Sequence, residues 1–136
     1  MKELELKEIG TVIIFEKEGT CVVNTTPHPI TMMNSDGEVV TVPTTVLVNA
    51  KAEEKTVSKF LVTTEFIKTQ EGEEVIEKIK SAYKETDRQE ELIIVGSIIA
   101  AQAYKGDVCG MTPCAGYERV APSEKRMNCD KFTVFC

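Results

Sequence analysis

The sequence predicts an α+β fold in a single domain over residues 1–136: a mostly antiparallel or mixed β-sheet with one amphipathic helix and one short apolar helix packed on it. Three observations lead to this class. β-Branched runs alternate with turn residues through 1–68, apolar residues recur at helical spacing only within 71–88, and an apolar strand followed by a capped helix opens the segment 92–136. A chain of 136 residues is long enough to bury a hydrophobic core without help from disulfides or metal.

Two hairpins are expected in the β-rich part. The first joins strands at 11–15 and 20–24 through a charged connection with a glycine, and the second joins 30–33 and 38–42 through Asn-Ser-Asp-Gly. Pro27 and Pro29 break the pattern between the hairpins, and Pro43 ends the last strand. Further strands are expected at 44–50 and 59–68, on either side of the charged segment 51–55.

The amphipathic helix has its apolar residues on one face and its charges on the other, which predicts a surface helix packed on the sheet. Glu74 and Lys78 stand in the favourable i, i+4 order. The apolar face consists of Val75, Ile76, Ile79, Ala82 and Tyr83.

The segment 92–136 begins with four consecutive aliphatic residues, which are too few for a helix and suit a buried strand. Gly96 then allows a turn, Ser97 can cap a helix over 98–104, and Gly106 ends it. The start of a helix after a strand is a possible phosphate site, because unpaired N–H groups meet the positive end of the helix dipole. The alternative is a strand and helix that only build the core. The remainder of the segment is expected to be a loop that carries the binding site.

Composition limits the partners. A net charge of −6 and a pI near 4.9 argue against binding of long nucleic acids, which normally requires a basic surface. Residues 105–136 nevertheless have a balance of +1, so residues 1–104 carry −7, and the tail is suited to a small anion. The charged start of the chain and the lack of any long apolar segment predict a soluble, intracellular protein without membrane contact.

The cysteines do not form a recognisable metal motif. Their spacing does not match paired C-x2-C zinc ligands, and the single histidine, His28, is distant in sequence. We expect free thiols in a reducing cytosol, no metal and no cofactor. The five are Cys21, Cys109, Cys114, Cys129 and Cys136.

Arginines and aromatics near the C-terminus suggest a nucleotide-like ligand. Arg119 and Arg126 present planar groups suited to two-pronged phosphate contacts, and Tyr117 and Phe132 offer faces on which a purine can stack. The alternative is that the arginines pair with Glu118 and Glu124 or with a neighbouring subunit.

His28 is the other polar candidate. It is either a general base or a ligand contact, or, as we favour, a structural hydrogen-bonding residue in the Thr-Thr-Pro-His-Pro turn. No catalytic triad, metalloprotease motif, P-loop or dinucleotide fingerprint is present in the sequence, so no catalytic residue is expected.

Several motifs together resemble the first described family of phage anti-Thoeris proteins. The resemblance extends over most of the chain and is most specific in the second half, while the first element alone is common in small phage and bacterial proteins. The motifs are N-T-T-P-H-P-I at 24–30, T-E-F at 64–66, I-x-G-S-I-I-A-A-Q-A-Y-x-G at 94–106, G-Y-E-R-V-x-P-x-E-K-R-M at 116–127 and D-K-F-T at 130–133. Lys105-Gly106 and the cysteines at 109, 114 and 129 do not fit that pattern.

The resemblance implies a non-enzymatic sponge encoded by a phage or prophage and acting in the host bacterial cytoplasm. Such proteins bind the cyclic ADP-ribose isomer (gcADPR) made by Thoeris TIR proteins and withhold it from its effector. They form homodimers, in some cases hexamers, with pockets near subunit interfaces, and some also bind the cyclic oligonucleotides of CBASS defence.

The same resemblance assigns expected ligand contacts. Arg119 and Arg126 would hold the pyrophosphate and ribose edges, Gly96 and Ser97 would lie at the helix start, and one aromatic would stack on adenine. The aromatic candidates are Phe66, Tyr117 and Phe132, and Thr133 completes the set.

Two other functions remain open at this point. One is a small cyclic-nucleotide hydrolase similar to viral ring nucleases, with His28 or Glu118 positioned for in-line attack. The other is a structural phage component in which the apolar segment 92–104 forms an oligomer interface.

Overall fold

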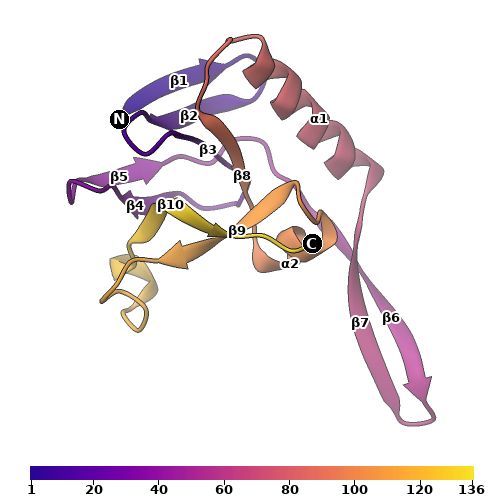
Figure 1. The fold of residues 1–136 in the computed structure, drawn as a ribbon. Coiled ribbons are helices and arrows are strands. Elements are labelled where there is room, and N and C mark those ends of the chain that lie inside the picture. The colour runs from indigo at the N-terminus through magenta and orange to yellow at the C-terminus, as the bar shows by residue number, and fades with distance from the viewer.

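The computed structural model describes all 136 residues and has an α+β fold, as predicted. One mixed sheet of eight strands has the order β1-β2-β3-β8-β9-β10-β4-β5, and strands β6 and β7 form a separate two-stranded hairpin (Figure 1). The strands are β1 Lys2–Leu6, β2 Gly10–Phe15, β3 Thr20–Asn24, β4 Ile30–Met33, β5 Val39–Val42, β6 Ala50–Ser58, β7 Leu61–Lys68, β8 Glu91–Val95, β9 Val108–Pro113 and β10 Met127–Thr133. The helices are α1 Gln70–Lys84, α2 Ile98–Ala103 and the short 3-10 helix η1 Pro122–Glu124.

Parallel and antiparallel pairs both occur in the sheet. The predicted hairpins β2–β3 and β4–β5 are confirmed as antiparallel pairs. β3, β8 and β9 run parallel to one another, because α1 and α2 return the chain to the same end of the sheet before each new strand. β10 then pairs antiparallel with β9 and parallel with β4, so that it joins the two predicted hairpins into one sheet.

The central strands β2 and β3 are buried on both faces of the sheet. Val12 and Ile14 of β2 pack toward α1 and α2, whereas Ile13 and Phe15 pack into a second core with β4 and β5. The sheet curls to enclose that second core. Thr20 of β3 donates a hydrogen bond to the carbonyl of Cys129 at 2.8 Å, which connects β3 directly to β10. A strand buried on both faces has no alternation of apolar and polar residues, which explains the continuous apolar runs.

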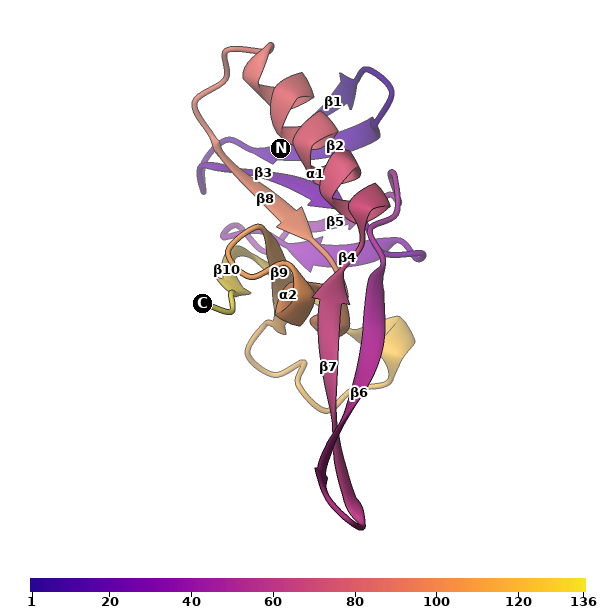
Figure 2. The ribbon, with the colours of Figure 1, turned by 90° about the vertical axis from the view of Figure 1, so that its right-hand side faces the viewer.

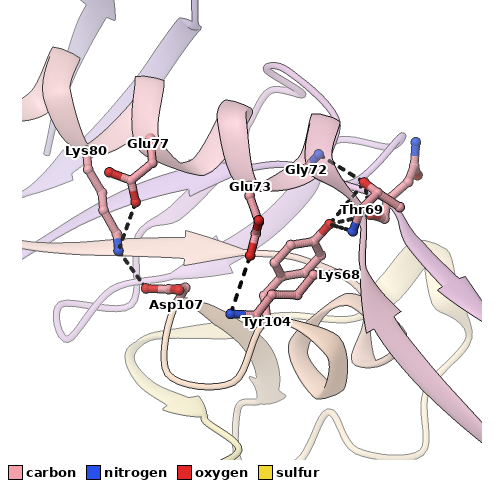
Figure 3. Close-up of polar contacts among 9 residues, drawn as sticks. Lys68, Thr69, Gly72, Glu73, Glu77, Lys80, Tyr104 and Asp107 are labelled. Carbon is pink, nitrogen blue, oxygen red and sulfur yellow. Dashed lines mark hydrogen bonds and ion pairs between the residues drawn. The ribbon is translucent and has the colours of Figure 1, made fainter.

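The amphipathic helix is confirmed, although it begins at Gln70 and ends at Lys84. Thr69 caps it by accepting a hydrogen bond from the amide of Gly72 at 3.0 Å. The hydroxyl of Tyr104, just after α2, accepts from the Thr69 amide at 2.9 Å and donates to the carbonyl of Asn49 at 2.8 Å (Figure 3). Tyr104 is fully buried and therefore fixes the junction of α1 and β7 to α2.

Residues 44–49 do not form the predicted strand. Only Thr44 makes an isolated bridge, to Asn24. The amides of Thr45 and Val48 instead donate to the carbonyls of Asn24 and Thr25, so their hydrogen bonds follow the irregular turn after β3. The hydrogen bonds that would form a strand ladder are thus made to that turn.

The charged segment 51–55 lies within strand β6, not between two strands as expected. All nine residues of β6 are exposed or half-buried because the β6–β7 hairpin extends away from the body (Figures 1 and 2). A strand that faces water on both sides has no apolar alternation, so the sequence offered no signal for it.

Three further strands of the main sheet, β1, β9 and β10, were not predicted from the sequence. β1 was treated only as a charged N-terminus, although Leu4 and Leu6 alternate with charged residues in the manner of a strand. β9 and β10 lie in the part predicted to be a loop. Only the connection between them, residues 114–126, is irregular, and it contains the short helix η1. The sequence did not indicate these strands because β9 contains Gly110 and Pro113 and β10 contains charged residues, all of which are uncommon within strands.

Candidate functional site

The loop between β9 and β10 holds three of the predicted contact residues. Its two ends are joined by a hydrogen bond from the amide of Cys114 to the carbonyl of Arg126 at 2.7 Å. Gly116 has a φ of 89°, which permits the reversal that follows β9, and its amide donates to the Glu118 carboxylate at 3.0 Å. The loop is therefore held at its base, and the side chains after Gly116 lie at the surface.

Arg126 and Tyr117 lie side by side in this loop. The guanidinium carbon of Arg126 is 5.9 Å from the centre of the Tyr117 ring, within the range of a cation–π interaction. The Nη1 atom of Arg126 donates to the backbone carbonyls of Glu124 and Lys125 at 3.4 and 3.3 Å. These contacts orient the guanidinium without neutralising its charge.

Arg119 is exposed and forms no hydrogen bond or ion pair. The alternative expectation, that the two arginines pair with the carboxylates of Glu118 and Glu124, is not met within the chain. Glu118 instead accepts from the Gly116 amide through its carboxylate and from Lys125 through its carbonyl. Both guanidinium groups are thus free of intramolecular carboxylate partners.

Gly96 and Ser97 lie in the tight turn between β8 and α2. A Cβ atom on Gly96 would come within 2.6 Å of a Val108 methyl group, so the close approach of β8 and β9 requires glycine here. Ser97 caps α2 as predicted, and its hydroxyl accepts from the Ala100 amide at 3.1 Å. Both residues have structural roles, which favours the alternative of a core strand and helix.

The other aromatic candidates lie on separate surfaces. Phe66 of β7 packs against the core beneath the helices, whereas Phe132 of β10 packs against the core on the opposite face of the sheet. Thr133 lies beside Gly110, its partner on β9. The structure therefore brings together Tyr117, Arg119 and Arg126, and it places the other five candidates elsewhere.

The turn 25–29 is a structural element, and its most important residue was missed. Asn24 is fully buried, and its side-chain amide donates to the carbonyls of His28 at 2.8 Å and Val42 at 3.2 Å. His28 takes part through its backbone carbonyl, while its ring is exposed and makes no hydrogen bond. The predicted structural role thus belongs to Asn24 and the carbonyl of His28. The sequence could have indicated this role of Asn24, since an asparagine side chain beside a proline-containing turn commonly forms hydrogen bonds with nearby backbone groups.

A large groove separates α1 from the turn between β1 and β2. It has a volume of about 780 Å³ and is lined by five glutamates and two lysines, a balance of −3. The helical spacing predicts only a solvated charged face on α1, and nothing in the local sequence indicates the groove. The charged residues that line it are Lys7, Glu8, Glu73, Glu74, Glu77, Lys78 and Glu85.

Two smaller cavities are present. One of about 310 Å³ lies below α1 beside Lys68, Glu73 and Asp107 (Figure 3), and one of about 260 Å³ lies beside Asn34, Cys114 and Asp130. None of the eight predicted contact residues lines any of these three cavities.

The five cysteines are all free thiols. Burial raises the pKa of Cys21 and of Cys129 to about 12, and it also raises the pKa of Cys109 and of Cys114. These four thiols are therefore poor nucleophiles in the folded protein. No three His, Cys, Asp or Glu side chains are grouped so that they could hold a metal ion.

Neither of the two α-helices combines the length and the apolar character needed to cross a membrane. Comparison with known proteins gives no relative: no family model, curated protein or solved structure matches the chain.

Proposed function

We propose that this protein is a viral sponge that binds a small cyclic nucleotide signal, a cyclic ADP-ribose isomer such as gcADPR, and sequesters it without cleaving it. The observation that carries the proposal is the state of Arg119 and Arg126. In a chain with a net charge of −6, both guanidinium groups of this loop lack a carboxylate partner. Unpaired arginines in an acidic protein are suited to an anion supplied from outside the chain.

The chemistry of the loop fits the ligand class. A cyclic ADP-ribose isomer presents a pyrophosphate and a purine, and the loop offers two guanidinium groups and the ring of Tyr117. Arg126 already lies over that ring, so a stacked base and a bound phosphate would occupy adjacent positions. Binding then requires charge neutralisation and stacking but no acid or base.

The biological setting follows from the sequence resemblance to the anti-Thoeris family. The protein would act in the cytoplasm of an infected bacterium as a homodimer or hexamer, and cyclic oligonucleotides of CBASS defence would be a second class of ligand. The loop 114–126 joins the ends of β9 and β10 and extends away from the sheet (Figure 1).

Calorimetry with cyclic ADP-ribose isomers tests this function, with the ligand recovered afterward by heating the complex and analysed by chromatography. We expect tight binding and intact ligand. Linear product would instead establish the hydrolase, and the absence of binding to every isomer and every cyclic oligonucleotide would contradict the proposal.

Single-residue variants test the site. Arg119→Ala or Arg126→Ala should weaken binding by about 1.5–3 kcal/mol for each charged hydrogen bond lost. Folding should change little, because neither side chain has an ion-pair partner whose loss would matter. Lys2→Ala removes the same charge from β1 at the far edge of the sheet and is the matched control. Unchanged affinity in both arginine variants would contradict the site.

A further inference from the structure

The hairpin formed by β6 and β7, here called the arm, has no packing partner along most of its length. Figures 1 and 2 both show it extending away from the sheet and helices. Residues 51–65 are all exposed, and the half-buried residues of the arm, Ala50, Phe66 and Ile67, lie at its base. A single two-stranded hairpin is at best marginally stable in water, so an arm of this length requires a surface to pack against.

The tip of the arm is apolar. Its four large apolar side chains, Val57, Phe60, Leu61 and Val62, are 65, 86, 62 and 55 % exposed. Soluble proteins seldom expose neighbouring large apolar side chains unless the patch contacts a partner. Phe60 is a suitable anchor because a buried aromatic removes a large apolar area from water.

The arm, like residues 105–136, has a positive balance in an acidic protein. Between residues 50 and 68 there are four lysines and three acidic residues, a balance of +1, so the remaining residues carry −7. Lys55 is paired with Glu65 at 2.8 Å, whereas Lys59 at the tip has no carboxylate partner and lies 5.3 Å from the Phe60 ring centre. The tip thus combines an apolar anchor with an unpaired positive charge.

The groove beside α1 has the complementary properties. Its balance is −3, and Glu8, Glu74 and Glu85 form no ion pair. Its lining includes the apolar side chains of Ile9 and Ala82. A volume of about 780 Å³ is large enough for an aromatic and a lysine side chain together.

The positions of the arm and α1 suit an exchange between two copies. The arm and α1 are consecutive, meet at Thr69, and extend in opposite directions from that residue (Figure 2). A twofold axis near Thr69 therefore places the arm of each copy beside α1 of the other. A nine-residue strand spans about 30 Å and a 15-residue helix about 22 Å, so the tip of the arm reaches the C-terminal end of the partner's α1, near Glu85.

We infer that the arm is a dimerisation element that packs along α1 of a second copy of this chain, with Phe60 and Lys59 entering the partner's acidic groove. The inference extends the oligomeric part of the proposed function and rests on it. It uses none of the proposed ligand contacts in the loop 114–126.

Sedimentation velocity over a concentration series tests this interface on the full-length protein. We expect a dimer whose dissociation constant rises at least about tenfold in Phe60→Asp and in Lys59→Glu, the magnitude of one lost buried contact. Lys59→Glu combined with Glu85→Lys, at the end of the groove that the tip reaches, should recover much of the lost affinity. Lys2→Glu, an equal charge reversal on β1, should leave the dimer unchanged. Far-UV circular dichroism checks that each variant is folded, which is expected because the tip touches nothing in its own chain.

Carbodiimide cross-linking provides a second readout. In an equal mixture of unlabelled and ¹⁵N-labelled chains, amide bonds between Lys59 of one copy and a groove glutamate of the other should appear in mass spectra as mixed-isotope peptides. A monomer at every concentration would overturn both the inference and the oligomeric part of the proposed function. A dimer that tolerates all arm variants would overturn the inference alone.

Discussion

Gly72 offers the most direct test of how α1 is attached to the body of the protein. Alanine is about 1 kcal/mol more favourable than glycine within a helix, so helix propensity alone predicts that Gly72→Ala stabilises α1. The tertiary structure predicts the opposite. A Cβ atom at this position would lie 1.8 Å from the hydroxyl oxygen of Tyr104 and 2.7 Å from its Cζ atom.

The size of the destabilisation follows from the packing and the hydrogen bonds that Tyr104 would lose. Ordinary contact begins near 3.4 Å, so the hydroxyl would have to move by about 1.6 Å, the difference between 3.4 and 1.8 Å. Tyr104 is fully buried, and its hydroxyl hydrogen-bonds the Thr69 amide and the Asn49 carbonyl. Overpacking costs about 1–3 kcal/mol and each hydrogen bond about 1 kcal/mol, which outweighs the gain in propensity. We expect a net loss of about 2–4 kcal/mol in the free energy of unfolding.

Urea unfolding followed by far-UV circular dichroism measures this change, since the chain has no tryptophan to report by fluorescence. Ser81→Ala, at an exposed position of α1, is the control and should change stability by no more than about 0.5 kcal/mol. In a Tyr104→Phe background the 1.8 Å contact no longer exists, so Gly72→Ala should cost less there. A Gly72→Ala protein as stable as the parent, or a cost unaffected by Tyr104→Phe, would refute the reasoning.

Three further predictions concern charge, thiols and backbone. A hydrogen bond from Arg88 at 2.8 Å lowers the pKa of Glu90 in the folded protein. Ionised Glu90 therefore stabilises the fold at any pH above its unfolded-state pKa, and this stabilisation is lost as the pH falls through the lower folded-state pKa. Glu90→Gln should therefore flatten the acid side of the stability–pH curve measured by urea unfolding, and an unchanged curve would contradict this. With a thiol reagent at pH 8, the exposed Cys136 should react quickly, the half-buried Cys109 more slowly, and the three buried cysteines only on unfolding, so fast reaction of a buried thiol would show that the core is open. Glu8 has a φ of 68°, so Glu8→Gly should raise the melting temperature by relieving about 1 kcal/mol of backbone strain, and a lower melting temperature would argue against strain at this turn.

The predicted contact set shows what local sequence can say about a site. Arg119, Tyr117 and Arg126 are within ten residues of one another, and one short loop keeps them close, so sequence proximity was sufficient for this part. Phe66 and Phe132 are 66 residues apart, and only the path of the sheet between them places them on opposite cores. The groove beside α1 is formed by a turn near the N-terminus and a helix more than 60 residues later in the chain. No local sequence pattern predicts that these two segments lie together.

The sequence by itself determined the elements whose signal is local. The hairpins β2–β3 and β4–β5, the helix α1 and the Ser97 cap of α2 each follow from apolar spacing, turn residues or a capping side chain within a few positions. Only the tertiary structure decided the remainder: the strand order, the curl that buries β3 on both faces, and the partnerless arm. These features depend on contacts between residues far apart in the chain, whose free energy comes from burial and hydrogen bonding in the complete fold and leaves no period or motif in the local sequence.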